Sequence, residues 1–271
     1  MNNRWEWAST SGIEYITMLN WTDRGAHLSF SSRGGGVSNG PYKSLNLSFQ
    51  VGDKPDDVLT NRMILMDAIS GDLHNTICCE QANGSQVAVV GITDRGRGSV
   101  QYADSIPGCD AMITNIKEVV LMCLVADCVP VYFFDPIKRV IGLAHFGYNP
   151  NYGNVAWETA KKMSQVFGCN YWDIEVFIGP GIGHCCNKID EEKAQHLRDT
   201  YPLLKNNINN NKKRVYWDMA STISQTLEIL GISPDNISTC DLCTRCSTDR
   251  FFSTDRKSVT GRMAAVLSLT K

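Results

Sequence analysis

The sequence has little that would place the protein in a membrane or on a nucleic acid. No apolar run approaches the about 18 residues of a membrane-spanning helix, and the N-terminal residues lack the apolar core of a signal peptide. Lysine and arginine number 26 against 28 acidic residues, the net charge is −2, and no basic tract stands out. Non-specific binding to nucleic acid or anionic lipid is therefore not expected. We expect a cytoplasmic protein.

A nucleotide-binding P-loop is also missing, although the chain contains one conspicuous glycine run. Three glycines, Gly34–Gly36, follow Arg33, but they lack the P-loop spacing and its Lys-Ser/Thr ending. Glycine allows the backbone of a loop to approach a ligand closely. The run therefore leaves two interpretations open, an anion-binding loop and a plain flexible turn.

Cysteine, in contrast, is abundant. The chain has 11 cysteines, an odd number, in a large sequence with no export signal, so reduced thiols or metal ligands are expected instead of a disulfide framework. Cys240, Cys243 and Cys246 resemble half of a zinc or iron–sulfur site. No second CxxC stands elsewhere, and Cys185 and Cys186 are adjacent. The pattern favours structural thiols and leaves a metal site as the alternative.

The centre of the chain carries the most informative stretch. Two apolar runs, Val119–Val125 and Val131–Phe134, flank Asp127 and Cys128, and a third run ends at His145. Short β-rich runs separated by turn signals predict buried strands. An acid, a thiol and an imidazole then lie at strand ends, where they could serve as metal ligands or as a nucleophile and its base. The alternative is a buried cysteine, a capping aspartate and a core histidine.

Helices and strands both occur, but they do not simply alternate along the chain. Apolar periodicity and capping residues predict helices at about 55–70, 154–167, 190–201 and 218–230, and strands at 86–90 and 174–178. The Asn/Lys-rich segment 205–214 is predicted to be a solvated loop. No linker or internal repeat divides the sequence. We therefore predict a single α+β domain over residues 1–271.

Several short motifs, taken in order, resemble the family named after the bacterial YfiH protein, also called the laccase-domain or polyphenol oxidase family. The motifs are Arg33–Ser38, Ser44–Leu47, Val51–Asp53, Asn61–Arg62, Asp110–Thr114, Ala126–Pro130, Ala144–His145, Gly179–Gly183, Cys243–Thr244, Phe251–Ser253, Arg256 and Thr260–Arg262. The resemblance implies a layered α/β/β/α sandwich of mixed sheets with outer helices. It also implies zinc-dependent purine nucleoside phosphorylase activity, with adenosine deaminase and methylthioadenosine phosphorylase activities.

The same resemblance implies a catalytic and metal site. Cys128 and His145 match two of the family's metal ligands, and Asp127 accompanies them as a catalytic residue. The third ligand position, a histidine in the family, is Asn83 here. Asparagine is a poor zinc ligand, although its amide can hydrogen-bond a substrate. We therefore expect zinc binding to be weak or absent, with His184 as a candidate substitute ligand. The family's Trp-Arg is replaced by Tyr148-Asn149.

The resemblance further implies a purine nucleoside and phosphate as partners. By family position and charge, the substrate-binding candidates are Arg33, Asn46, Arg62, Asn83 and Arg256. Arginine suits phosphate because its guanidinium can donate paired hydrogen bonds.

Three other functions stay open. The first is a metal-free hydrolase or deaminase with Cys128 as nucleophile and His145 as base. The second is a divergent paralogue that binds a nucleoside or a protein and turns over little. The weakest is a true multicopper laccase, because such a centre uses many imidazoles and the chain has five histidines.

Overall fold

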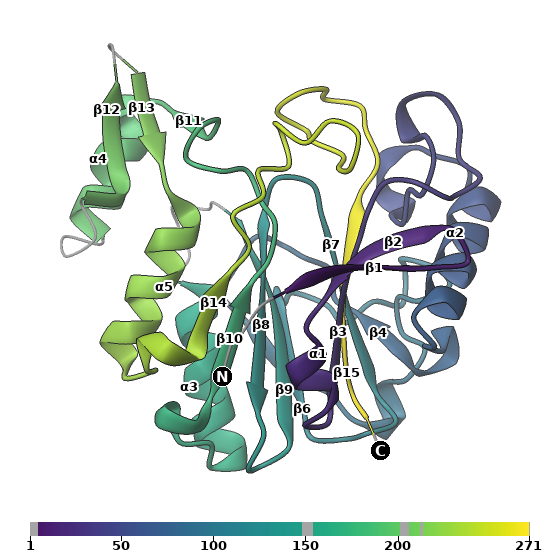
Figure 1. Ribbon diagram of the computed structural model, residues 1–271, viewed down its shortest axis with the longest axis horizontal. Coiled ribbons are helices and arrows are strands. Elements are labelled where there is room, and N and C mark those ends of the chain that lie inside the picture. The colour runs from purple at the N-terminus through teal and green to yellow at the C-terminus, as the bar shows by residue number, and fades with distance from the viewer. Residues whose placement is uncertain (1–4, 148–153, 201–205, 212–213, 271) are drawn as a thin grey trace.

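Two six-stranded sheets pack face to face between outer helices in the computed structural model, which describes residues 5–147, 154–200, 206–211 and 214–270 (Figure 1). The first sheet has the order β1 (Glu6–Thr10), β2 (Ile13–Thr17), β3 (Ala26–Ser31), β15 (Met263–Leu269), β7 (Val120–Val125), β4 (Thr76–Cys78). The second has the order β14 (Ile237–Thr239), β10 (Glu175–Ile178), β8 (Val129–Asp135), β9 (Val140–Phe146), β6 (Ala111–Thr114), β5 (Val87–Val89). Both sheets mix parallel and antiparallel pairs.

The helices cover the outer faces of the two sheets. Helix α2 (Pro55–Ala68) lies against the first sheet, and α3 (Val155–Phe167) and α5 (Met219–Leu230) lie against the second (Figure 1). A four-residue helix, α1 (Leu19–Thr22), precedes β3. Within the described residues, no helix combines the length and the apolar character needed to span a bilayer. The predicted α/β/β/α sandwich is confirmed.

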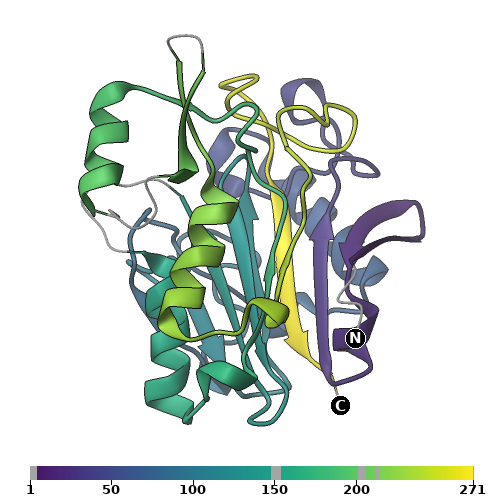
Figure 2. The ribbon, with the colours of Figure 1, turned by 60° about the vertical axis from the view of Figure 1, so that its left-hand side comes forward.

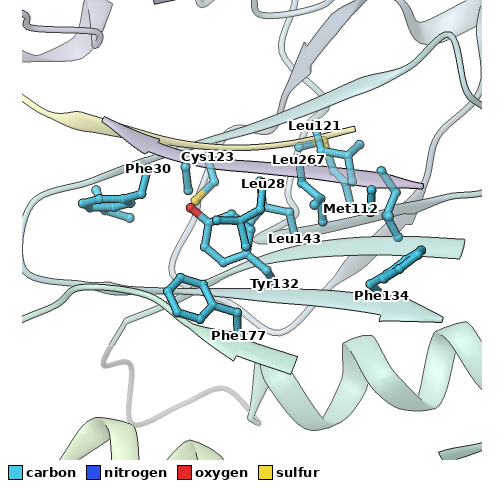
Figure 3. Close-up of a cluster of buried hydrophobic side chains, with 14 of the residues drawn as sticks. Leu28, Phe30, Met112, Leu121, Cys123, Tyr132, Phe134, Leu143, Phe177 and Leu267 are labelled. Atoms are coloured by element: carbon cyan, nitrogen blue, oxygen red, sulfur yellow. The ribbon is translucent and has the colours of Figure 1, made fainter. Parts of the chain in front are cut away.

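The central strands are mostly apolar, as expected where both faces of a sheet are buried. On β8, Tyr132 and Phe134 point into the core between the sheets, whereas Phe133 points to the helices beyond. Side chains of a strand alternate between its faces, so a strand covered on both sides reads as an unbroken apolar run. Figure 3 shows the core between the sheets, where Tyr132 lies beside Phe177 and faces residues of the first sheet.

Local capping signals determine where the outer helices begin and end. The Asn154 side chain accepts hydrogen bonds from two amides at the start of α3, and Gly168 ends that helix with a left-handed φ of 67°. At α5, Asp218 accepts from the Ser221 amide, and Gly231 ends the helix with φ 109°. A capping side chain accepts from the free amides of the first helical turn. Glycine adopts the left-handed conformation that ends a helix.

One segment that the sequence analysis predicted to be a loop contains paired strands instead. Strands β12 (Ile208–Asn211) and β13 (Arg214–Trp217) pair antiparallel, and β11 (Lys188–Ile189) joins them in a small third sheet beside α4 (Glu191–Thr200). The prediction of a solvated loop at 205–214 was wrong for residues 208–211 and for Arg214. Pairing with β13 overrides the low strand preference of the asparagines, which is a common result of tertiary context.

Several loops gather at one end of the sandwich, at the top of Figures 1 and 2. They include the segment before β15, drawn yellow, and the loop after β10. The two segments are in contact, because Gly181 and Cys243 form a parallel β-bridge. The turn between β7 and β8, which carries Asp127 and Cys128, reaches the same end because Ile182 donates its amide to the Asp127 carbonyl, 2.8 Å.

Candidate active site

The register of β8 and β9 brings Cys128 and His145 together. Val129 pairs with Phe146 and Pro130 with His145, so Cys128 lies opposite Gly147 at the end of the sheet. A Cβ atom added to Gly147 would lie 3.1 Å from the Cys128 Sγ and 3.6 Å from the His145 Cε1. It would lie 2.8 Å from the Asn83 Oδ1. Three side chains therefore surround a space that only glycine leaves open.

Asp110 holds the His145 ring in place. The His145 Nδ1 is 2.9 Å from the Asp110 Oδ1, and the His145 amide donates to the Asp110 carbonyl, 2.8 Å. The same carboxylate accepts from the amides of Asn83 and Gly84, at 3.0 and 2.6 Å. With Nδ1 on Asp110, the other ring nitrogen is the one available to Cys128. The sequence analysis did not select Asp110, although an acid directly before a buried strand was a usable signal.

The charge state of His145 follows from these neighbours. Burial is the largest single effect and would by itself lower the pKa of His145, but the charges and hydrogen bonds of Cys128 and Asp110 together outweigh it. The pKa of His145 is therefore raised to about 10. A buried imidazole between an acid and a thiol is the arrangement in which a histidine activates a nucleophile or ligates a metal.

Asp127 is buried, and its carboxylate accepts hydrogen bonds from one segment of the chain. Its two oxygens accept from the Thr244, Ser253 and Thr254 hydroxyls, at 2.7, 3.0 and 2.9 Å, and from the Asp255 amide, 2.8 Å. The residue itself has a left-handed φ of 84°. Its position thus ties the Cys128 turn to the loop before β15, and its catalytic role stays a prediction.

Two of the predicted substrate-binding residues lie in structural positions. Arg62 is 2% exposed, and its guanidinium donates to the carbonyls of Leu47, Gly98 and Ser99, at 2.8, 2.6 and 2.7 Å. Asn46 is fully buried, and its amide oxygen accepts from the Ser48 and Arg262 amides. The Nε and Nη1 atoms of Arg62 therefore hold main-chain carbonyls, which favours a structural role over the predicted contact with phosphate.

Arg33 and Arg256 lie together beside the loop before β15. Arg33 donates to the Lys43 and Thr248 carbonyls and stacks on the Phe252 ring, 4.6 Å from its centroid. Arg256 donates to the Arg245 and Phe251 carbonyls, at 2.8 and 2.5 Å. Burial lowers the pKa of Arg33, and the charge of Arg256 lowers it further, so the two guanidinium groups are within electrostatic reach of each other.

Two cations that the sequence analysis did not select lie within electrostatic reach of Cys128. Burial lowers the pKa of Arg262, while the charges of Cys128 and Asp127 act to raise it. Burial also lowers the pKa of Lys193 on α4, and Asp190 and Cys128 oppose that effect. Arg262 ends the Thr260-Gly-Arg motif, so its place in the sequence pattern was visible, but only the fold shows that its charge reaches Cys128.

His184 pairs with a different acid. Its Nδ1 is 3.8 Å from the Asp218 Oδ2, and 70% of its side chain is exposed. It lines a cavity of about 340 Å³ together with Asp218, Cys185 and Cys243. Cys128 and His145 do not line this cavity. The idea that His184 substitutes for the missing ligand therefore finds no support in the fold. Tyr148 and Asn149, the other departures at the site, lie outside the described residues.

The structure also assembles four cysteines that the sequence leaves apart. The sulfur atoms of Cys185, Cys186, Cys243 and Cys246 all lie within 4.8 Å of one another, and such a group could hold a metal ion. Cys240, the first cysteine of the spaced triple, is buried elsewhere. Sequence spacing could not find this group, because its halves come from two loops about 60 residues apart.

The two sheets, the outer helices and the strand-end thiol and imidazole define a single-domain mixed α/β protein with a candidate site at one end of its sandwich. The chain belongs to the family described as multi-copper polyphenol oxidoreductase laccase, whose model matches residues 27–270. This confirms the predicted family.

Relatives in this family carry an enzymatic name. The chain is 33% identical over 260 residues to purine nucleoside phosphorylase YlmD of Geobacillus stearothermophilus, covering 90% of each protein. It is 31% identical to YlmD of Bacillus subtilis, covering 96% of this chain and 95% of that protein. The crystal structure of YlmD from G. stearothermophilus superposes with a TM-score of 0.92 at 30% identity, over 98% of this chain and 99% of that one. The family is thus one of purine nucleoside phosphorylase-like proteins.

A multi-copper centre, which the family description implies, does not fit these residues. His27 lies on β3 beside Ser29, His74 follows α2, and His184 pairs with Asp218. At most two of the five histidines are left for Cys128. Even one blue-copper ion takes two histidines and a cysteine, so several copper ions cannot be ligated here.

Proposed function

We propose that the protein cleaves a purine nucleoside with phosphate at the space around Gly147. The observation that carries this proposal is the contact of His145 with both Asp110 and Cys128, beside the charge of Arg262. The names of the relatives support the reaction class. The inosine, guanosine, adenosine or methylthioadenosine that the family resemblance implies are the candidate substrates.

In this proposal, the chain supplies charge, orientation and hydrogen bonds. Arg262 and Lys193 attract the phosphate, since both lie within electrostatic reach of Cys128 and cationic groups concentrate anionic substrates. We assign the phosphate contact to Arg262 instead of Arg62, through the guanidinium nitrogens that do not hold the Thr260 and Gly261 carbonyls. Arg33 and Arg256 hold the adjoining loop through its carbonyls. Asp110 orients His145 and Asp127 positions the Cys128 turn.

Zinc fits this donor set only in part. Cys128 and His145 are good ligands, and the Asn83 oxygen points into the same space, but zinc sites are built from cysteine, histidine and carboxylates. When bound, zinc in an open site activates a water or polarises the substrate. We propose weak binding through Cys128 and His145, with Asn83 as a substrate-binding amide.

A metal-free deaminase or hydrolase is the second candidate. It is favoured by the raised pKa of His145, about 10, beside the Cys128 thiol, because a thiolate–imidazolium pair is the reactive form of such a nucleophile. In that reaction Asp110 keeps its role as the group that orients the imidazole.

Product analysis separates these functions. Purified protein is incubated with inosine, adenosine and methylthioadenosine, with and without phosphate, before and after chelator treatment. Free base that requires phosphate supports the phosphorylase, and ammonia from adenosine without phosphate supports the deaminase. The absence of any product indicates a non-catalytic nucleoside or protein binder.

Two variants test whether any activity belongs to this site. His145→Ala should abolish product formation, because it removes the group between Asp110 and Cys128. Arg95→Gln, at an exposed position that bonds to Asn75, is the control and should keep full activity. Full activity of His145→Ala would show that the reaction takes place elsewhere.

A further inference from the structure

The four-cysteine cluster has the dimensions of a closed metal site. The Cys186 and Cys246 sulfurs are 3.3 Å apart, and those of Cys185 and Cys246 are 3.7 Å apart. Four sulfurs placed at about 2.3 Å around a tetrahedral zinc would lie about 3.8 Å from one another. The longest separation, below 4.8 Å, leaves room for one ion at the centre.

The surroundings of two of the four sulfurs, those of Cys243 and Cys186, suit negative charge. The amides of Gly183, Arg245 and Cys246 donate to the Cys243 sulfur, the first over 3.2 Å. The Arg245 guanidinium donates to the Cys186 sulfur, 3.7 Å, and is also paired with Asp255. Hydrogen bonds and a cation around the sulfurs are the outer interactions that orient thiolate ligands and stabilise their charge.

We propose that Cys185, Cys186, Cys243 and Cys246 together bind one zinc ion in a closed, structural site. All four positions of a tetrahedral ion are then taken by protein sulfur, so no open position remains for water or substrate. Soft thiolate ligands in a tetrahedral set select zinc over harder cations. The site is separate from Cys128 and His145 and does not depend on the function proposed above.

The zinc would order the loops that hold the candidate active site. One pair of ligands follows Ile182, whose amide donates to the Asp127 carbonyl, 2.8 Å. The other pair flanks Thr244, whose hydroxyl donates to the Asp127 carboxylate, 2.7 Å, and whose amide donates to the Gly181 carbonyl, 2.9 Å. The ion therefore joins the two loops on either side of Asp127, the residue before Cys128. Its role is to position this turn, not to take part in the reaction.

Zinc content per chain tests the proposal once the other site is removed. In a Cys128→Ala/His145→Ala background, purified anaerobically with a reductant, we expect about one zinc per chain by mass spectrometry. Cys246→Ser in the same background should lose it. Cys240→Ala is the matched control, since Cys240 belongs to the sequence triple but not to the cluster, and it should keep the zinc. Absence of zinc from the background protein, or retention after Cys246→Ser, overturns the proposal.

A second measurement uses no variant, so its result does not depend on whether a substituted protein folds. The unaltered protein is treated with a mercurial that reacts with thiolates, and released zinc is followed with a dye while thiols are counted. The proposal expects release of zinc and 11 thiols per chain after denaturation with a chelator, the full cysteine count. Nine thiols with no zinc would mean that two cysteines of the cluster form a disulfide instead, and would overturn the zinc site.

Discussion

The Asp110 carboxylate lies 2.9 Å from the His145 Nδ1, and it also holds the amides of Asn83 and Gly84. One buried acid therefore organises two sides of the space around Gly147. This relationship assigns Asp110 as the positioning residue of the candidate active site, because it acts through His145 and the Asn83 turn.

Asp110→Asn should lower the rate of nucleoside cleavage by about 10- to 100-fold, the usual cost of losing a partner that orients a site histidine. The amide cannot accept from all the donors that the carboxylate serves, so the ring and the Asn83 turn both lose their position. Steady-state kinetics should show the loss in kcat and a shift of the pH profile. Asp67→Asn, at an exposed position on α2, is the control. Equal kinetics of the two variants would contradict the assignment.

Gly147→Ala should obstruct the site, with the Asn83 side chain shifting to admit the methyl. The added methyl would lie 2.8 Å from the Asn83 oxygen and 3.1 Å from the Cys128 sulfur, where no substrate atom or ion could then enter. We expect kcat/KM to fall at least about tenfold, equivalent to about 1.4 kcal/mol. Gly91→Ala is the matched control, because its Cβ meets nothing within 4 Å. Normal turnover by Gly147→Ala would place the reaction elsewhere.

Substitution of Arg62 should reduce the stability of the protein, whereas substitution of Arg262 should weaken its binding of phosphate. Arg62→Ala leaves three buried carbonyls without their donor, each at a cost of about 1–3 kcal/mol, so urea unfolding should show a loss of about 3 kcal/mol or more. Its folded fraction should keep normal phosphate dependence. Arg262→Gln should instead raise the KM for phosphate about tenfold, because a hydrogen bond to a charged group contributes about 1.5–3 kcal/mol. Weakened phosphate binding in Arg62→Ala alone would reverse our assignment.

Asn83→His should increase zinc retention at Cys128 and His145. Asn83 has a left-handed φ of 58°, a conformation in which histidine is also enriched, and its side chain already points into the site. An imidazole would complete a three-ligand catalytic zinc set. In a Cys246→Ser background, which removes the second proposed site, zinc per chain should rise from well below one to about one. Full zinc occupancy of that site with Asn83 in place would contradict the expectation.

His27 should make stability depend on pH. Burial lowers the pKa of His27 on β3, whereas in the unfolded chain it is about 6.5. The unfolded state therefore binds the proton more readily, and the free energy of unfolding falls as pH drops below about 6.5. Above that pH the contribution is fully present. His27→Gln should flatten this slope in urea unfolding measured from pH 7.5 to 5, compared with His74→Gln at an exposed position. An unchanged slope would refute the prediction.

Local patterns in the sequence were enough to predict much of the fold. The apolar runs around Asp127 and Cys128 are β7, β8 and β9, and capping residues such as Asn154 and Asp218 mark helix starts. The ordered motifs led to the family, which the comparison confirms. These inferences succeed because strand periodicity, helix capping and turn preference depend on residues close together in the chain.

The sequence by itself thus predicted the central strands, the main helices and the family, and it selected Cys128 and His145 as candidate site residues. Only the tertiary structure decided that Arg62 is buried against main chain and that the charge of Arg262 reaches Cys128. It alone joined Cys185–Cys186 to Cys243 and Cys246, and Ile208 to Trp217 in a hairpin. The physical reason is that these contacts depend on sheet register and loop packing between distant segments, whereas periodicity and capping act over only a few residues.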